Sequence, residues 1–323
     1  MSKPEIVAIA PLPAFFAKPL HENFTVHDLH GAADAEARRA LIAKIAPTTR
    51  GMVAFGGSQL APDQLAKFPH LEIISVFGVG YDGMPLAACA EAKVKVTNTP
   101  DVLNDEVADT AVALTLMTCR QFVGAHKFVE AGDWLKGQYP LTHSLWGKTV
   151  GIIGLGRIGK GIAERLAAHK MSVAYFGRNK QDVTYTYYSN LVEMAGDVDV
   201  LIAITPGGAA TKHLVNAAVL QALGPTGFFI NVARGSVVDQ DALVKAIEAG
   251  TIAGAGLDVF EAEPKVPEAL FNRRNVVLLP HVASATHETR QAMADLAVEN
   301  LALHFAGKPV KTLVPELAGK VNP

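Results

Sequence analysis

The feature that most constrains the fold of this chain is a series of short apolar segments separated by helical patterns in its second half. Six such segments are bounded by glycine, proline or aspartate: Thr149–Ile153, Val173–Phe176, Val198–Ile204, Gly227–Val232, Gly254–Asp258 and Val276–Leu279. Apolar runs this short, alternating with helices, are typical of parallel strands whose two faces are covered. We therefore predict a doubly wound α/β domain in this half.

A similar alternation fills the first third of the chain. Its apolar runs and helical patterns are Ile6–Ile9, Ala32–Ala46, Gly51–Phe55, Ile73–Val76 and Val94–Thr97. Because 323 residues exceed one domain of about 100 to 200 residues, we predict two α/β domains. Residues 1–100 and 288–323 are expected to form a discontinuous domain, and residues 101–287 the other.

Composition and charge exclude several kinds of partner. The 29 basic and 31 acidic residues nearly cancel, and no block of like charges indicates nucleic-acid or membrane binding. No apolar run reaches the ~18 residues of a membrane-spanning helix. Cys89 and Cys119 lie far apart without metal-ligand spacing, so we predict reduced thiols, no metal and a cytoplasmic location. A small molecule is the expected partner.

A glycine-rich sequence, Gly154-Leu155-Gly156-Arg157-Ile158-Gly159, follows the predicted strand Thr149–Ile153 and opens a helical pattern. There the first glycine permits a sharp turn, the second lets the backbone approach a pyrophosphate, and the third lets the helix pack on the strand. The helix N-terminus favours the phosphate charge. A tight turn without a ligand is the alternative, but the context favours a dinucleotide-binding loop.

A second cofactor signal lies about 20 residues beyond these glycines, where an NAD-binding protein places an acid for the ribose hydroxyls. The chain has Gly177-Arg178-Asn179-Lys180 there, without an acid. Arg178 and Lys180 are suited to bind a 2′-phosphate through charge-assisted hydrogen bonds. A solvated basic turn is the alternative. We predict NADP, with NADPH preferred, and keep NAD as the other candidate.

Three polar residues follow predicted strands at the edge where open α/β sheets bind ligands. Arg234 provides a fork for a carboxylate, and His281 suits proton exchange near neutrality. Glu263 would fix the tautomer of the histidine and favour its protonated form. Reduction of a 2-keto acid needs such a set. Taken singly, a histidine is more often a surface or capping residue, as we assume for His213, and Glu261 with Glu263 would make an ordinary solvated pair.

In combination these motifs resemble the D-isomer-specific 2-hydroxyacid dehydrogenase family. The similarity covers most of the chain: Phe77–Asp82, Val150–Arg165, Ile230–Leu243, Gly254–Pro264 and Leu279–Arg290. It implies a Rossmann NAD(P)-binding domain at 101–287 and a smaller flavodoxin-like substrate domain. It also implies reduction of a 2-keto acid to a D-2-hydroxy acid. In that reaction Arg234 binds the substrate, His281 is the acid and base, and Glu263 supports His281.

Within the family, Gly177-Arg178 and Pro280–His287 resemble the NADPH-dependent glyoxylate and hydroxypyruvate reductases. The resemblance implies that the N–H groups of Val79 and Gly80 bind the substrate carboxylate and that Phe55 lines the substrate pocket. Further cofactor contacts are implied for Thr110, Thr205, Pro206, Val232, Ala233, Asp258 and Ser284. The sequence does not rank glyoxylate, hydroxypyruvate and phenylpyruvate as substrates.

Two segments depart from the family pattern. Pro206-Gly207-Gly208 replaces the more usual Pro-Leu-Thr, and His169-Lys170-Met171 replaces Phe-Gly-Met, so that a helix lacks its glycine cap. Two alternatives to the expected enzyme also stay open: an NADH-preferring relative with another substrate range, and a non-catalytic dinucleotide sensor on the same fold. A sensor would not need Arg234, Glu263 and His281 together.

The stretch between the two series predicts a subunit contact. Asp105–Ala131 has the pattern of one long, largely apolar helix, and Gly132–Trp146 is too aromatic and apolar to be left in water. We predict a homodimer joined through both segments. Trp134 or Tyr139 is expected to reach the active site of the partner.

Overall fold

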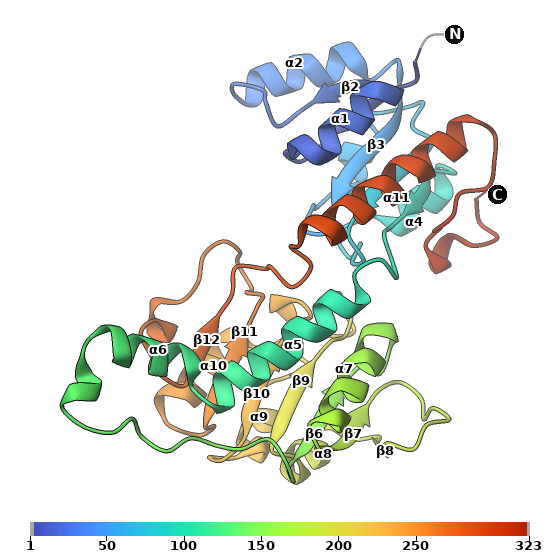
Figure 1. The fold of residues 1–323 in the computed structure, drawn as a ribbon. Helices are drawn as coiled ribbons and strands as arrows, with labels where there is room; N and C mark the ends of the chain where they lie inside the picture. The colour runs from blue at the N-terminus through green and yellow to red at the C-terminus, as the bar shows by residue number, and fades with distance from the viewer. Residues whose placement is uncertain (1–2, 322–323) are drawn as a thin grey trace. The chain divides into compact units, whose positions relative to one another are not determined.

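The computed structural model describes residues 3–321, which form two compact units (Figure 1). One unit contains the chain up to Leu103 together with the segment from Thr286 onward, and the other is Asn104–Ala285. Each unit is built on its own parallel sheet with helices around it, so the predicted fold class is confirmed. The assignment of substrate binding to the first unit stays a prediction.

The first unit has a five-stranded parallel sheet in the order β2-β1-β3-β4-β5, which is the flavodoxin-like order. Its strands are β1 (Glu5–Ala8), β2 (Thr25–Asp28), β3 (Thr49–Phe55), β4 (Ile73–Phe77) and β5 (Lys95–Thr97). Its helices are α1 (Ala14–Asn23), α2 (Ala35–Ile45), α3 (Pro62–Leu65), α4 (Leu86–Glu91), α11 (His287–Phe305) and the 3-10 helix η4 (Pro315–Leu317). The long helix α11 packs on α1 and on the interior strand β4.

The sequence patterns missed α1 and β2 of this unit, as well as the short helices α3, α4 and η4. Helix α1 contains Pro19 and buries only Phe16 and Leu20, so its apolar periodicity is short. Strand β2 is an edge strand with no fully buried residue. Both are held by tertiary contacts, because β2 pairs with β1 and α1 packs on α11.

The second unit has a seven-stranded parallel sheet in the order β12-β11-β10-β9-β6-β7-β8. Its strands are β6 (Thr149–Ile153), β7 (Ser172–Phe176), β8 (Thr186–Tyr188), β9 (Val200–Ala203), β10 (Phe228–Asn231), β11 (Gly254–Leu257) and β12 (Val276–Leu278). The strand order reverses between β6 and β9, as in a Rossmann sheet. Six of the strands match the predicted runs, and β8 is an unpredicted edge strand. Ligands of such sheets bind beyond the carboxyl ends of the strands beside this reversal.

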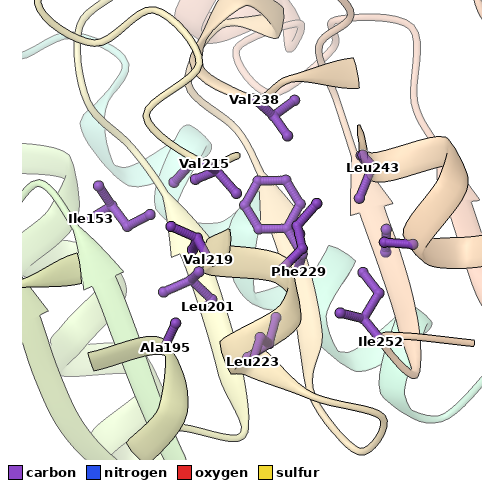
Figure 2. Packing of buried hydrophobic residues seen from close by; sticks show 14 of the residues in the cluster. Ile153, Ala195, Leu201, Val215, Val219, Leu223, Phe229, Val238, Leu243 and Ile252 are labelled. Carbon is purple, nitrogen blue, oxygen red and sulfur yellow. The ribbon is translucent and has the colours of Figure 1, made fainter. Parts of the chain in front are cut away.

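Helices cover both faces of this sheet (Figure 1). The helices are α5 (Asn104–Cys119), α6 (Phe122–Glu130), α7 (Arg157–Ala168), α8 (Leu191–Asp197), α9 (Ala217–Leu223) and α10 (Gln240–Glu248), with 3-10 helices η1 (Asp133–Leu135), η2 (Gly235–Val237) and η3 (Glu268–Leu270). Helices α5 and α7 lie side by side, and α9 contacts both α8 and α10. The core beneath α8, α9 and α10 surrounds Phe229 of β10 and includes Leu201, Val215 and Val219 (Figure 2).

The prediction of one helix over Asp105–Ala131 is wrong. Helix α5 ends at Cys119, Gln121 takes a left-handed conformation with φ of 49°, and α6 begins at Phe122. The two helices differ in burial, since α5 packs on α7, β10 and β11 whereas α6 buries no residue. The apolar face of α5 is therefore used within its own unit.

The end of α7 lacks a glycine cap, as the sequence predicts. Lys170 takes the left-handed conformation there, with φ of 62°. The N–H of Met171 donates to the Leu166 carbonyl, and that of Lys170 to the Ala167 carbonyl, which is the Schellman arrangement normally formed with glycine. The capping bonds are present, but Lys170 has the steric cost of a Cβ in this conformation.

Candidate active site

The candidate residues of the second unit lie at one edge of its sheet. The glycine loop follows β6, the basic segment follows β7, Arg234 follows β10, Glu263 follows β11 and His281 follows β12. All these strands are parallel, so their carboxyl ends share an edge. This is the edge at which Rossmann sheets bind a dinucleotide and its substrate.

His281 and Glu263 form a hydrogen-bonded pair. Nδ1 of His281 lies 2.8 Å from Oε2 of Glu263, and Oε1 of the same carboxylate accepts the Phe260 N–H at 3.0 Å. Burial alone would raise the pKa of the Glu263 carboxyl, but these hydrogen bonds and the charges of His281 and Arg234 outweigh it and lower that pKa. The carboxylate is therefore ionised at neutral pH, and Nδ1 must be the donor. Proton exchange with a substrate is left to Nε2 of His281.

The backbone around His281 is held by Asp258. His281 itself has a left-handed φ of 55°, and its N–H donates to the Asp258 carbonyl at 2.8 Å. The buried Asp258 carboxylate accepts the N–H groups of Val282 at 2.8 Å and Ala283 at 3.1 Å. Burial raises the pKa of this carboxyl, and the two backbone hydrogen bonds oppose the rise. Within the chain, Asp258 thus holds the segment after β12; its predicted cofactor contact stays a prediction.

Arg234 lies close to the loop that carries Glu263. Its neighbour Gly235 meets that loop so tightly that a Cβ there would lie 1.9 Å from the Phe260 carbonyl carbon. Nη1 of Arg234 donates to the Ala233 carbonyl at 2.8 Å, and its charge contributes to lowering the pKa of Glu263. The structure therefore brings Arg234, Glu263 and His281 together.

The glycine loop fits the pyrophosphate of a dinucleotide. Gly154 has φ of +101°, which favours glycine, and a Cβ on Gly159 would lie 2.1 Å from the Gly154 carbonyl oxygen. A Cβ on Gly156 would have no atom within 4 Å, so space is open where the phosphates would approach. Gly156 is the N-cap of α7, a helix of 12 residues. The N-terminus of such a helix favours an anion. Leu155 is buried, whereas Arg157 is exposed and Ile158 half-buried at the helix start.

The basic segment after β7 is exposed and lies beside the glycine loop in sheet order. Arg178, Asn179 and Lys180 are all exposed, and Gly177 would tolerate a Cβ without any contact within 4 Å. Strand β7 pairs directly with β6. The segment therefore has both the charge and the access that a phosphate group requires.

The remaining predicted cofactor residues border the same edge. Oγ1 of Thr110 on α5 donates to the Ala283 carbonyl at 3.3 Å, next to the half-buried Ser284. Thr205 follows β9 and its hydroxyl donates to the Pro206 carbonyl at 2.8 Å. Val232 and Ala233 are buried directly after β10.

The predicted substrate residues Phe55, Val79 and Gly80 belong to the first unit. Phe55 ends β3 and packs on Phe77, with ring centroids 5.0 Å apart. Val79 and Gly80 follow β4, and the Val79 carbonyl accepts the Asn98 side-chain amide at 2.9 Å. Their proposed contacts with the substrate stay predictions.

One pair near this edge was not expected from the sequence. Nε2 of His213 lies 2.7 Å from Oε1 of Glu261, and the His213 N–H donates to the Ser236 carbonyl at 2.8 Å. His213 thus joins the segment after β9 to the loop that carries Glu263. No local sequence signal could have shown this pair, because its partners are 48 positions apart.

The region after α5 carries an exposed apolar surface. It comprises Phe122, Val129, Trp134, Leu135, Leu141 and Trp146, of which Leu135 is 94% and Leu141 100% exposed. Within residues 3–321 no helix combines the length and apolar character needed to cross a membrane. The same described range contains no group of three or more histidine, cysteine or acidic side chains arranged to hold a metal.

Comparisons with known proteins agree with this geometry. The family model "D-isomer specific 2-hydroxyacid dehydrogenase, NAD binding domain" matches residues 112–283. Hydroxyphenylpyruvate reductase of Plectranthus scutellarioides is 44% identical over 310 residues, which cover 96% of this chain and 98% of that protein. A glyoxylate/hydroxypyruvate reductase of Arabidopsis thaliana is 41% identical with the same coverage. The NADPH-dependent glyoxylate/hydroxypyruvate reductase of Sinorhizobium meliloti, solved with NADP and malonate, is 46% identical and superimposes with a TM-score of 0.90, covering 98% of each chain.

Proposed function

The chain belongs to the D-isomer-specific 2-hydroxyacid dehydrogenase family, and on that premise we propose that it reduces small 2-keto acids to D-2-hydroxy acids with NADPH. The observation that carries this proposal is the 2.8 Å pair of His281 and Glu263 beside Arg234 at the ligand edge of a Rossmann sheet. Glyoxylate and hydroxypyruvate are the proposed substrate class, because relatives with these names match nearly the whole chain.

Each residue of the set has a chemical task in this reaction. When bound, the dihydronicotinamide supplies a hydride to the keto carbon. Nε2 of His281 donates a proton to the carbonyl oxygen, so the carbonyl becomes an alcohol and the imidazole becomes neutral. Glu263 orients the ring through Nδ1 and stabilises the imidazolium before the transfer. Arg234 binds the substrate carboxylate through a bidentate fork.

The cofactor would be held by two segments of this chain. The glycine loop Gly154–Gly159 and the N-terminus of α7 would bind the pyrophosphate. Arg178, assisted by Lys180, would bind the 2′-phosphate that distinguishes NADPH from NADH, since no acid is present at this position to repel it. A structural relative of 46% identity was solved with NADP, which supports the same choice of cofactor.

Steady-state rates with each nicotinamide and each keto acid test this function. We expect glyoxylate and hydroxypyruvate to be reduced faster with NADPH than with NADH, and the chiral product from hydroxypyruvate to be the D-isomer. His281→Ala should lower kcat by at least ~100-fold with little change in cofactor binding, the usual scale of general acid catalysis. Binding of dinucleotide without turnover of any 2-keto acid would instead favour a sensor.

We also propose that the protein is a homodimer. The exposed apolar surface from Phe122 to Trp146 supports a partner copy, because monomers rarely leave such side chains in water. Trp134, which is 63% exposed, is the side chain proposed to reach the active site of the partner, with Tyr139 as the alternative. A monomeric mass in light scattering at micromolar concentration would contradict this proposal.

A cytoplasmic location is proposed from the thiols. Both cysteines are free and buried. Burial raises the pKa of the Cys89 thiol to about 11 and that of Cys119 to about 12, so neither is a reactive thiolate. Free thiols persist in reducing compartments. Recovery of the protein in a cytosolic fraction is the expected result, and its recovery from an organelle would contradict the proposal.

A further inference from the structure

Tyrosine hydroxyl groups form hydrogen bonds at both ends of the basic segment after β7. The hydroxyl of Tyr187 on β8 donates to the Gly177 carbonyl at 3.3 Å. The hydroxyl of Tyr175 on β7 accepts the Gln181 N–H at 2.7 Å and lies 3.5 Å from the Gln181 carbonyl oxygen. Tyr175 is fully buried and its ring packs on Tyr187, with centroids 5.3 Å apart. These tyrosines therefore fix where the segment begins and where it ends.

Gln181 also connects this segment to the glycine loop. Its side-chain Nε2 donates to the Leu155 carbonyl at 2.8 Å, across 26 positions of sequence. The backbone of Gln181 is held by Tyr175, while its side chain is held by the glycine loop. A single half-buried residue thus sets the separation of two cofactor-binding segments.

We propose that Gln181 is a positioning residue for the choice between NADP and NAD. A dinucleotide has its pyrophosphate and its 2′-phosphate at a limited range of separations, so both groups bind well only if the two segments are correctly spaced. With Gln181 bonded to Leu155, Arg178 is placed for the 2′-phosphate when the pyrophosphate lies on the glycine loop. This inference rests on the proposed role of Arg178.

The two dinucleotides should respond differently to the loss of this bond. NADP uses both segments, so a mobile basic segment has to be ordered on binding, and that ordering reduces affinity. NAD has no 2′-phosphate and gains nothing from Arg178. Loss of one hydrogen bond corresponds to about a threefold to tenfold change in an equilibrium constant. We expect Gln181 to affect NADP by that factor and NAD hardly at all.

Calorimetric titration of the whole protein with NADP⁺ and with NAD⁺ tests this without turnover. Gln181→Met keeps the length of the side chain and removes its donor, so the Kd for NADP⁺ should rise about threefold to tenfold. The Kd for NAD⁺ should stay within about twofold of wild type. The matched control is Gln291→Met, because the Gln291 amide donates to Asp295 within α11 of the other unit. The control should change neither affinity.

A second background shows whether Gln181 acts through Arg178. In Arg178→Ala protein, adding Gln181→Met should have no further effect on NADP⁺ affinity, since the group to be positioned is gone. Hydrogen exchange in the cofactor-free protein should be faster at the amides of Arg178, Asn179 and Lys180 in Gln181→Met, and unchanged in β6. Tyr175→Phe should likewise weaken NADP⁺ binding and speed exchange at these three amides. If that variant does not fold, the results with Gln181→Met decide alone.

Several results would overturn the proposal. Equal weakening of NADP⁺ and NAD⁺ by Gln181→Met would make Gln181 a support of the glycine loop only, and unchanged affinities would remove it from binding. Additive effects with Arg178→Ala would separate it from that residue. Failure of the proposed cofactor preference is distinguishable, because it would be seen in the wild type alone as equal affinities for the two dinucleotides.

Discussion

Replacement of Glu263 by glutamine should lower the rate of keto acid reduction. The carboxylate accepts both the His281 Nδ1–H and the Phe260 N–H, whereas a glutamine has one oxygen for these two donors and no charge. The glutamine therefore orients the imidazole less firmly, and proton donation from Nε2 of His281 becomes less efficient. The kcat/KM of the variant should fall.

The size of the effect follows from the lost charge-assisted bond, worth roughly 1.5 to 3 kcal/mol when well shielded. The His281 and Glu263 side chains are 43% and 35% exposed, so solvent screening places the effect near the lower limit. This corresponds to about a tenfold loss of kcat/KM.

The measurement is kcat/KM for glyoxylate with NADPH between about pH 5.5 and 9, for wild type and Glu263→Gln. Cofactor affinity should be unchanged. The lowered pKa of Glu263 means that its own contribution is complete in this range and is lost only as pH falls through that lowered value. A kcat/KM of Glu263→Gln within about twofold of wild type throughout this range would refute the reasoning.

Other predictions address substrate binding, cofactor choice and stability. Arg234→Gln should mainly raise the KM for the keto acid, because it removes the carboxylate fork; an unchanged KM would reassign the residue. Arg178→Ala should raise the KM for NADPH at least about tenfold and leave that for NADH within a few-fold. Lys170→Gly should raise the free energy of unfolding by about 0.5 to 1 kcal/mol in chemical denaturation, since glycine removes the strain at φ of 62°. Burial lowers the pKa of His304, although Glu72 opposes this shift. The free energy of unfolding should therefore fall as pH drops below the ordinary histidine pKa of 6.5, and this decrease should be absent in His304→Gln.

Parts of the site were predictable because they depend on local pattern and topology. Short apolar runs followed by glycine, arginine or histidine place those residues at strand ends, and parallel strands share an edge. That reasoning identified Gly154, Arg234 and His281 as neighbours of one sheet edge. The resemblance of the same motifs to the 2-hydroxyacid dehydrogenases is confirmed by the family model and the relatives.

The sequence by itself determined the order of strands and helices in the second unit, apart from β8, and the chemistry available at the carboxyl ends of its strands. Only the tertiary structure decided how those groups are held: the Asp258 carboxylate on the backbone of 282–283, the His213–Glu261 pair, and the Gln181 bond to Leu155. It also decided the break at Gln121, where the chain leaves the face of the sheet. The physical reason is that periodicity reports which side of an element is buried, whereas these contacts join side chains and backbone far apart in sequence, and depend on how the loops pack against one another.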